Sequence, residues 1–335
     1  MASSRLSPWA DRLSLQGFDR QALDCSMLAT AAATHMQLGP GRLHASIDRL
    51  RFNTLAMRVT AFSAAVRATV EPPKDVVTLG FVLRADEPFL IAGRRFQAGM
   101  MGVFAAGQVS EVRYPPGSRS VTLAMPSAVY ARELDSASIR KAPGDVNALR
   151  QVQVSRLDAV RLHDVISALE ALAARDSTLG LDKQWIANAE RALREAFLRP
   201  LCNFAASDRG SSGRLRAAGA IVREVDARLD ADPTSIPSIS ALCESLRISR
   251  RSLERAFHDL LGVSPAHHLR LRSLNAVREA LLRCRPEAGM ITRTAIENGF
   301  WHLGRFSLSY RALFGERPID TLRRRGRGDH LPRLS

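Results

Sequence analysis

Two absences in this 335-residue sequence exclude whole classes of protein. The four cysteines, Cys25, Cys202, Cys243 and Cys284, lie far apart and form no CxxC pair, so there is no zinc or redox motif and no sign of disulfides. No run of about 18 apolar residues occurs, which argues against a membrane-spanning helix. The first residues carry charges and lack the apolar run of a signal peptide. We therefore expect a soluble, cytoplasmic protein with no cofactor and no membrane partner.

Acidic side chains are scarce relative to basic ones. The chain has 48 Lys plus Arg against 33 Asp plus Glu, a formal net charge of +15, and a pI of about 11.0. Such a balance calls for a polyanionic partner, either nucleic acid or an anionic membrane surface. From Arg209 to the end there are 23 Arg and no Lys against 13 acidic residues, a net of +10. A solvated face is the simpler interpretation of a modest excess, but this concentration favours nucleic acid.

The basic part contains an internal repeat of one apolar frame. Apolar residues at a spacing of four lie on one face of a helix, and a following Gly suits a left-handed helix stop. Each copy therefore predicts one amphipathic helix with a defined end. The first copy reads Leu253, Phe257, Leu261, Gly262 and Pro265, and the second, 53 positions later, reads Phe306, Tyr310, Phe314, Gly315 and Pro318.

A shorter helix and a tight corner are expected before each of these helices. In the second copy, Ala295 precedes Gly299 at the interval at which a helix-turn-helix needs a small residue and then a flexible one. The first copy has Cys243 and Arg247 at these places. Because arginine lacks the freedom of glycine at positive φ, a left-handed Arg247 would cost about 1 kcal/mol. The second motif is therefore the better formed in sequence.

Between the two copies, residues 264–283 read as a single helix. Ser264 and Pro265 form a typical helix start. Twenty residues of helix span about 30 Å, close to the roughly 34 Å between successive major-groove faces on one side of DNA. Such a spacer can seat two recognition helices in adjacent grooves.

Residues from near Arg214 to Arg324 resemble the DNA-binding domain of AraC/XylS-type transcription regulators. The resemblance is carried by residues 246–265, by the spacer, and above all by the segments 299–306 and 314–318. It departs from the family pattern at Thr294, where an aliphatic residue is usual, and at Leu308, where a polar base-reading residue is common. These departures affect fine specificity rather than the fold.

The resemblance implies that the second helix of each motif enters the major groove. Three arginines on one turn of the first such helix favour DNA contact over simple solvation, and Glu254 can accept from a cytosine amine. The second helix presents fewer polar groups, which suggests apolar and phosphate contacts. The implied DNA-binding residues are Arg250, Arg251, Glu254 and Arg255 in the first motif and His302, Leu303, Gly304, Arg305, Ser307 and Leu308 in the second.

The stretch from about residue 43 to 125 has the alternating pattern of β-strands. Val77, Leu79 and Phe81 alternate with other residues, and short apolar runs are separated by turn signals, which is typical of a β-sandwich or barrel. A short helix is expected before it, near 22–33. The segment around Phe96, Gly99, Ala106 and Gly107 weakly resembles the small, cupin-like barrels that precede this DNA-binding domain in many family members. The only histidine of the stretch is His44, which argues against the metal site of a cupin enzyme.

A metal-free barrel interior is either a packed core or a place for a small-molecule effector. The resemblance favours the effector. Arg94, Arg95 and Arg113 can meet an acidic effector, although on alternating strands such residues more often face solvent, so no effector site is assigned.

We predict an α+β protein: a β-rich, cupin-like sandwich or barrel with a helical dimerisation segment, then an all-α domain with two helix-turn-helix motifs joined by a spacer helix. Helical periodicity returns from Val154, and the resulting helix pair either packs on the β domain, forms a homodimer, or does both. The predicted segments are 1–150 (β-rich regulatory domain), 151–206 (helical pair), 207–214 (linker), 215–325 (DNA-binding domain) and 326–335 (basic tail).

The predicted function is sequence-specific, effector-responsive activation of transcription, with promoter DNA and RNA polymerase as partners. Paired carboxylates, metal ligands and an activated nucleophile are absent, which argues against an enzyme tethered to DNA. A repressor of the same family and a nonspecific architectural DNA-binding protein remain alternatives.

Overall fold

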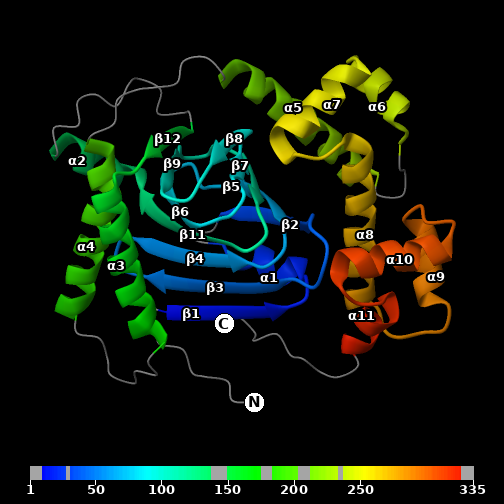
Figure 1. The fold of residues 1–335 in the computed structure, drawn as a ribbon, viewed down its shortest axis with the longest axis horizontal. Coiled ribbons are helices and arrows are strands. Elements are labelled where there is room, and N and C mark those ends of the chain that lie inside the picture. Colours follow the sequence, from blue (N-terminus) through cyan, green and yellow to red (C-terminus); the bar gives the residue numbers. More distant parts are fainter. Residues whose placement is uncertain are drawn as a thin grey trace.

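The computed structural model describes residues 10–27, 31–136, 149–174, 183–202, 212–232 and 237–325. Figure 1 shows a β-rich part at one end of the molecule and a group of helices at the other, which meet along helix α8 (Pro265–Arg283). Most of the predicted linker at 207–214 and all of the basic tail at 326–335 lie outside the described residues.

The β-rich part consists of two antiparallel sheets, in agreement with the predicted sandwich or barrel. One sheet has seven strands in the order β1-β3-β4-β11-β6-β9-β12, and the other has five in the order β2-β5-β10-β7-β8. The strands are β1 (Ala10–Gln16), β2 (Ala32–Gln37), β3 (His44–Arg51), β4 (Ala56–Phe62), β5 (Val66–Glu71), β6 (Val76–Arg84), β7 (Phe89–Ile91), β8 (Arg94–Phe96), β9 (Met100–Phe104), β10 (Ser110–Tyr114), β11 (Ser118–Pro126) and β12 (Arg150–Gln153).

Alternation along β6 assigns its side chains to two covered faces. Val77 and Leu79 belong to a buried apolar cluster that includes α3 (Arg156–Ala174) and α4 (Lys183–Cys202). Thr78 and Gly80 face the space between the sheets. The predicted helix pair packs on the seven-stranded sheet (Figure 1). Strand β6 therefore has helices on one face and the second sheet on the other.

Two details of the N-terminal part differ from the sequence-based expectations. The helix expected near 22–33 is only α1 (Arg20–Asp24), and the chain is already in β2 at Ala32. The helical periodicity from Val154 includes Leu157 and Val160 among its apolar positions, but on α3 these residues are 58% and 50% exposed. A further helix, α2 (Ser127–Ser136), follows β11. In the described part of the chain, no helix is long and apolar enough to cross a membrane.

The C-terminal part is helical in its described residues. Its helices are α5 (Ser212–Ala231), α6 (Ile239–Leu246), α7 (Arg250–Leu261), α8, α9 (Met290–Glu297), α10 (Leu303–Phe314) and α11 (Pro318–Arg325). Serine side chains accept hydrogen bonds from backbone N–H groups at the starts of α6, α7 and α8. These caps satisfy N–H groups that have no partner within the helix. The predicted start of the spacer at Ser264 and Pro265 is thereby confirmed.

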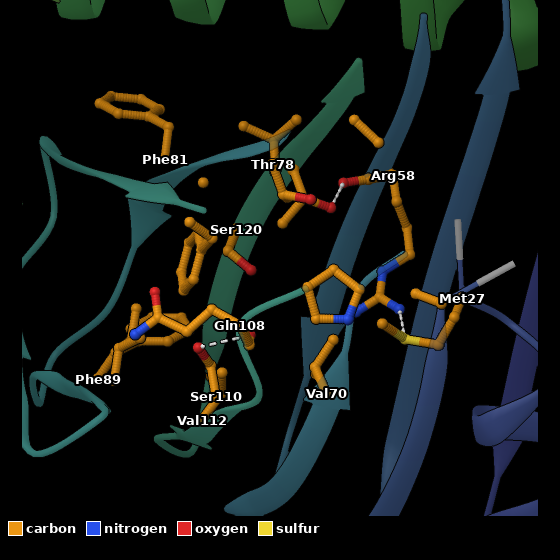
Figure 2. A pocket seen from close by; sticks show the side chains of 18 of the residues that line it. Met27, Arg58, Val70, Thr78, Phe81, Phe89, Gln108, Ser110, Val112 and Ser120 are labelled. Atoms are coloured by element: carbon orange, nitrogen blue, oxygen red, sulfur yellow. Dashed lines mark hydrogen bonds between the residues drawn. The ribbon is translucent and has the colours of Figure 1, made fainter. Parts of the chain in front are cut away.

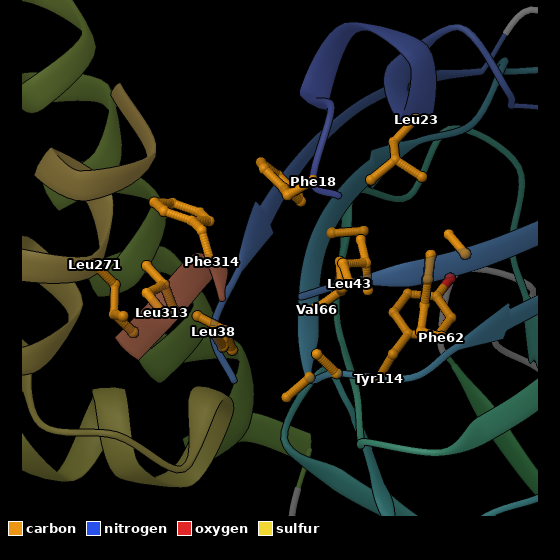
Figure 3. Close-up of a cluster of buried hydrophobic side chains, with 14 of the residues drawn as sticks. Phe18, Leu23, Leu38, Leu43, Phe62, Val66, Tyr114, Leu271, Leu313 and Phe314 are labelled. Carbon is orange, nitrogen blue, oxygen red and sulfur yellow. The ribbon is translucent and has the colours of Figure 1, made fainter. Parts of the chain in front are cut away.

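One apolar core runs from the β domain into the second half of the helical domain. Figure 3 shows Phe18 and Leu38 of the N-terminal part close to Leu313 and Phe314 of α10. The rings of Phe18 and Phe314 stack with centroids 6.5 Å apart. The first helix-turn-helix unit instead packs around a separate cluster that includes Phe257 and Leu260, together with Val222 of α5.

Candidate nucleic-acid interface

The first helix-turn-helix unit is formed by α6 and α7. The turn between them places Arg247 in the left-handed region, with φ of 53° and ψ of 42°. The N–H of Ile248 donates to the carbonyl of Cys243 at 3.0 Å and closes the turn. This backbone conformation costs a residue other than glycine about 1 kcal/mol, as the sequence analysis expected for Arg247. The packing around the turn must therefore offset this strain.

The second unit, α9 and α10, has the same turn built with glycine. The N–H of Phe300 donates to the carbonyl of Ala295 at 2.9 Å, and Gly299 adopts a φ of 82°. Ala295 is fully buried, which confirms the expected small residue beneath the crossing helix. The two motifs therefore share one backbone arrangement, and they differ in how easily their residues adopt it.

The two predicted recognition helices, α7 and α10, end as the sequence repeat predicted. Gly262 follows α7 with a φ of 69°, and Gly315 follows α10 with a φ of 68°. An added Cβ at Gly315 would lie 2.6 Å from the backbone nitrogen of Arg42. Gly315 is therefore required both for the helix stop and for the close contact with the β domain.

On α7 the predicted DNA-binding residues lie together on one exposed face. Leu253 and Phe257 face the core, while all four predicted residues are exposed. Arg250 Nε donates to Glu254 Oε1 at 2.9 Å, so these two side chains pair in the free protein. Exposed pairs of this kind contribute only about 0.3–0.5 kcal/mol, and a DNA phosphate or base can replace either partner. The exposed face contains Arg250, Arg251, Glu254 and Arg255.

On α10 the exposed face is more apolar. Leu308 is 72% exposed, and the preceding turn carries Trp301 at 75%. His302 occupies the N-cap position without capping the helix, so the first N–H groups of α10 have no side-chain partner there. The structure brings together the predicted residues His302, Leu303, Gly304, Arg305, Ser307 and Leu308, all of them exposed.

The spacer α8 holds the two units at fixed positions. Its 19 residues span about 28 Å, and Figure 1 shows α7 and α10 at opposite ends of it. Arg270 Nη2 on α8 donates to Ser309 Oγ on α10 at 2.6 Å. The geometry is that of a rigid connector rather than a flexible linker.

A buried network fixes the far end of α8, and sequence reasoning missed it. Arg278 is 1% exposed, and its guanidinium donates from Nε to the Phe18 carbonyl at 2.6 Å and from Nη1 to Glu316 Oε1 at 2.7 Å. Glu316 also accepts from the hydroxyl of Thr321 at 2.7 Å. Glu316 lies within segment 314–318, which carries the family resemblance. Its acidic side chain was the one feature of the sequence that could have indicated a basic partner.

A second buried network joins the β domain to the first unit. Arg67 Nη2 on β5 lies 2.6 Å from Asp226 Oδ2 on α5, and its Nε donates to Glu111 Oε2 at 2.8 Å. His268 Nε2 on α8 lies 3.0 Å from Asp226 Oδ1. Burial acts to raise the pKa of Asp226, but Arg67 and the hydrogen bond with His268 outweigh it, and the pKa lies well below its usual range.

Burial also lowers the pKa of His268 below the ordinary histidine value, although Asp226 opposes the shift. His268 is therefore a neutral imidazole whose Nε2–H donates to Asp226.

The described residues contain no group of three or more His, Cys, Asp or Glu side chains that could hold a metal ion.

Comparisons with known proteins identify the C-terminal part. Residues 242–324 match a family model described as a helix-turn-helix domain. The "XylDLEGF operon transcriptional activator 1" of Pseudomonas putida is 40% identical over 88 residues, which are 26% of this chain and 27% of that protein. The "Probable thc operon regulatory protein" of Rhodococcus erythropolis is 32% identical over 103 residues, 31% of each chain.

Two solved structures are similar over different lengths of the chain. A probable AraC family transcriptional regulator from Rhodopseudomonas palustris is 32% identical, with 32% of this chain and 97% of that chain covered and a TM-score of 0.28. The AraC-like transcriptional activator CuxR is 15% identical, with 86% and 99% covered and a TM-score of 0.40.

The chain spans only about a quarter of the length of the first curated relatives, and the shared part is the double helix-turn-helix described above. Both of these relatives are named as regulators of operons. The repeat, the two turns, the spacer and the sequence matches agree: the C-terminal part of the chain is a double helix-turn-helix of the AraC/XylS type.

Proposed function

We propose that this chain activates transcription by binding promoter DNA with α7 and α10 in adjacent major grooves. The observation that carries the proposal is the pair of helix-turn-helix units at the two ends of α8, each with its predicted reading face exposed. The span of α8, about 28 Å, is near the roughly 34 Å between successive groove faces.

The two helices are proposed to read DNA by different chemistry. On α7, Arg251 and Arg255 present guanidinium groups that fit the O6 and N7 atoms of guanine, and Glu254 can accept from cytosine N4. On α10, Leu303 and Leu308 offer apolar contact with thymine methyl groups, while Gly304 lets the backbone approach closely. The remaining residues, His302, Arg305 and Ser307, and the uncapped N–H groups of α10 are suited to phosphates.

We further propose that the β domain controls this binding and that the protein acts in the cytoplasm with RNA polymerase as its partner. The curated relatives from Pseudomonas putida are named activators, which supports activation over repression. The exposed Leu157 and Val160 on α3 support a homodimer formed through the helix pair. An effector would shift the population of chains whose two reading helices are free to bind.

Selection of bound duplexes from a random library by the purified chain, near physiological salt, tests the reading of DNA. Two enriched blocks about one helical turn apart support the proposal. Tight, strongly salt-dependent binding with no enriched block would instead identify a nonspecific architectural protein.

A reporter gene under the selected site then tests the sign of regulation. Transcription that rises when the chain is expressed, and does not rise with the double variant Arg251→Ala and Arg255→Ala, supports activation. Transcription that falls identifies a repressor of the same family.

A further inference from the structure

Trp301, in the turn before α10, is the most exposed of the large apolar side chains in the described part of the chain, at 75%. The interior of the β domain, by contrast, leaves little room: the space between its two sheets, which Figure 2 shows beside Phe89, Val112 and Arg58, amounts to only about 90 Å³. Tryptophan is highly buried on average, so an exposed tryptophan next to other exposed apolar residues marks a surface that meets a partner.

The turn that carries Trp301 is held firmly on both sides. The N–H of Phe300 donates to the carbonyl of Ala295 at 2.9 Å, and the ring of Phe300 packs against the ring of Phe306 with centroids 5.1 Å apart. On the other side, His302 occupies the N-cap position of α10. The backbone of Trp301 therefore lies between two fixed neighbours, and its side chain is presented from a defined position.

The first helix-turn-helix unit has no residue that corresponds to Trp301. In that unit Ser249, the N-cap of α7, follows the turn residue Ile248 directly. In the second unit Trp301 stands between the turn residue Phe300 and the N-cap His302. The second unit thus has one residue more between its turn and its helix, and that residue is the exposed tryptophan. Any contact that Trp301 makes belongs to the second unit alone.

The surface around Trp301 suits a polyanion. Residues 298–315 include no Asp or Glu, but they include Arg305 and Arg311, both of which are exposed. The same stretch contains the predicted DNA-binding residues of the second unit. An aromatic ring on a basic surface fits the backbone of DNA, in which apolar deoxyribose rings alternate with anionic phosphates. Duplex DNA is therefore the partner that the charge of this surface favours.

The width of the major groove limits where Trp301 can meet DNA. A helix with its side chains is about 10–12 Å in diameter, and the groove is about 12 Å wide, so α10 would fill the groove. A side chain that precedes the helix then meets the strand that forms the groove wall rather than the base edges. There the flat indole can lie on a deoxyribose while Nε1–H, its single donor, reaches a phosphate oxygen.

We propose that Trp301 contacts the sugar-phosphate backbone at the edge of the second major groove, with its ring on a deoxyribose and its Nε1–H donating to a phosphate. This inference rests on the DNA binding proposed above and adds a contact that reads no base. Backbone contacts fix the register and orientation of a protein on the duplex. Trp301 would thus position α10, whose exposed face offers few polar groups for base recognition.

Tryptophan fluorescence of the full chain tests this contact. The chain has tryptophans at positions 9, 185 and 301, so the double variant Trp9→Phe and Trp185→Phe leaves Trp301 as the single emitter. Acrylamide should quench this emission freely in the free protein and several-fold less once the selected duplex is bound. A shorter duplex that ends after the first block, added to saturation, should leave the quenching unchanged. Free quenching on the full duplex, or equal protection by the short one, overturns the proposal.

Two substitutions separate the ring of Trp301 from its N–H. Trp301→Phe keeps an aromatic ring without the donor and should raise the Kd about tenfold, the value of a hydrogen bond to a charged group. Trp301→Ala removes both parts and should raise the Kd further. Because the contact reads no base, each factor should be the same on selected and random duplexes. Since Trp301 is exposed, the melting temperature should not change. Wild-type Kd values in both variants would refute the contact.

The salt dependence of binding distinguishes Trp301 from a cation. Arg305→Ala is the matched variant on α10, and it should reduce the slope of log Kd against log salt concentration by about 0.9, the value of one phosphate contact by a cation. Trp301→Phe should leave the slope unchanged, because the indole carries no charge. A reduced slope in Trp301→Phe would show that the substitution displaces a cation, which contradicts a direct contact.

The outcomes separate this contact from the proposed function. A chain that binds no duplex refutes both. A chain that binds the selected duplex while Trp301 stays open to acrylamide keeps the proposed function and refutes the backbone contact. If transcription of the reporter is then lost in Trp301→Ala although DNA binding is not, the ring faces a protein partner instead.

Discussion

Arg67 on β5 and Asp226 on α5 form a largely buried ion pair between the β domain and the helix that packs against α7, with 2.6 Å between Nη2 and Oδ2. Glu111 and His268 complete the network from the strand side and the spacer side. Strand β5 and helix α8 thus both contact one carboxylate on α5. This makes Asp226 the best single position at which to probe contact between the two parts.

Asp226→Asn should lower the free energy of unfolding by about 2 kcal/mol, because Arg67 and His268 each lose a charged partner in a buried site. Urea unfolding followed by circular dichroism measures the change. Glu224→Gln is the matched control on the same helix, since Glu224 forms an exposed pair with Arg228 that is worth less than about 0.5 kcal/mol. Equal losses in the two variants would contradict the assignment.

The free energy of unfolding should fall as the pH drops below about 6.5, because two buried histidines are neutral in the folded chain. Burial lowers the pKa of His35 and of His268, although Asp24 and Asp226 oppose the shifts. The unfolded chain takes up protons near pH 6.5, whereas the folded chain does so only at lower pH, so this stability is fully present above pH 6.5 and lost below it.

Unfolding titrations between pH 5 and 8 measure this slope. The double variant His35→Asn and His268→Gln keeps an amide donor near each carboxylate and should flatten the slope. If the slope of stability against pH is unchanged in this variant, other titratable groups cause the pH dependence. The depressed pKa of Asp226 acts in a separate window, below about pH 4.

Arg255→Ala should weaken binding to the selected DNA by about 1–3 kcal/mol, the value of a bidentate contact with a base, and should affect random DNA much less. Fluorescence anisotropy with both duplexes measures the difference. Arg51→Ala removes the same charge from the β domain and should leave specific binding nearly unchanged. Equal losses on both duplexes would show that Arg255 contacts phosphate only.

Leu308 should read thymine through its methyl group. Replacing the thymines of the second selected block by deoxyuridine removes only methyl groups. The Kd should rise roughly fourfold, or about 0.8 kcal/mol, for each methyl group that the helix touches. Leu308→Ala should bind the two duplexes with nearly equal affinity. If the variant still distinguishes them as the wild type does, the methyl group is read by another residue, and the exposed Leu303 and Trp301 are the alternatives.

Arg247→Gly should stabilise the chain by about 0.5 kcal/mol. Relief of the left-handed strain, about 1 kcal/mol or more, exceeds the added freedom of glycine in the unfolded chain. Arg251→Gly provides a control of opposite sign, because Arg251 lies within α7 and glycine there should cost about 1 kcal/mol. A loss of stability in Arg247→Gly would show that the arginine side chain contributes packing at the turn.

The helical domain could be predicted because its signals are local. The frame of Leu253 and Phe257, its repeat at Phe306 and Tyr310, and the glycine stops all lie within one or two helices, where a spacing of four defines a face. The corner at Arg247 followed from the same frame. The strands of the β domain followed from alternation and turn residues for the same reason.

The contacts between the two parts could not be predicted, because they join residues far apart in the chain. Arg58 and Arg67 lie on consecutive strands and look alike in sequence, yet one faces an apolar cavity and the other an acidic network. Arg278 reads as one more polar position on the spacer until Phe18 and Glu316 are placed beside it. For buried arginines, the partner decides the role, and the partner is a property of the tertiary structure.

In the proposed complex with DNA, the rigid spacer α8 makes binding by one chain resemble bivalent binding. Once α7 occupies its groove, α10 is held near the next one at an effective concentration set by the helix rather than by the protein in solution. The gain in affinity depends on the rotational phase of the two groove faces around the DNA axis. About five extra base pairs between them would turn the second groove to the opposite side of the duplex. The contacts of Arg278 with the N-terminal part fix one end of this spacer against the β domain.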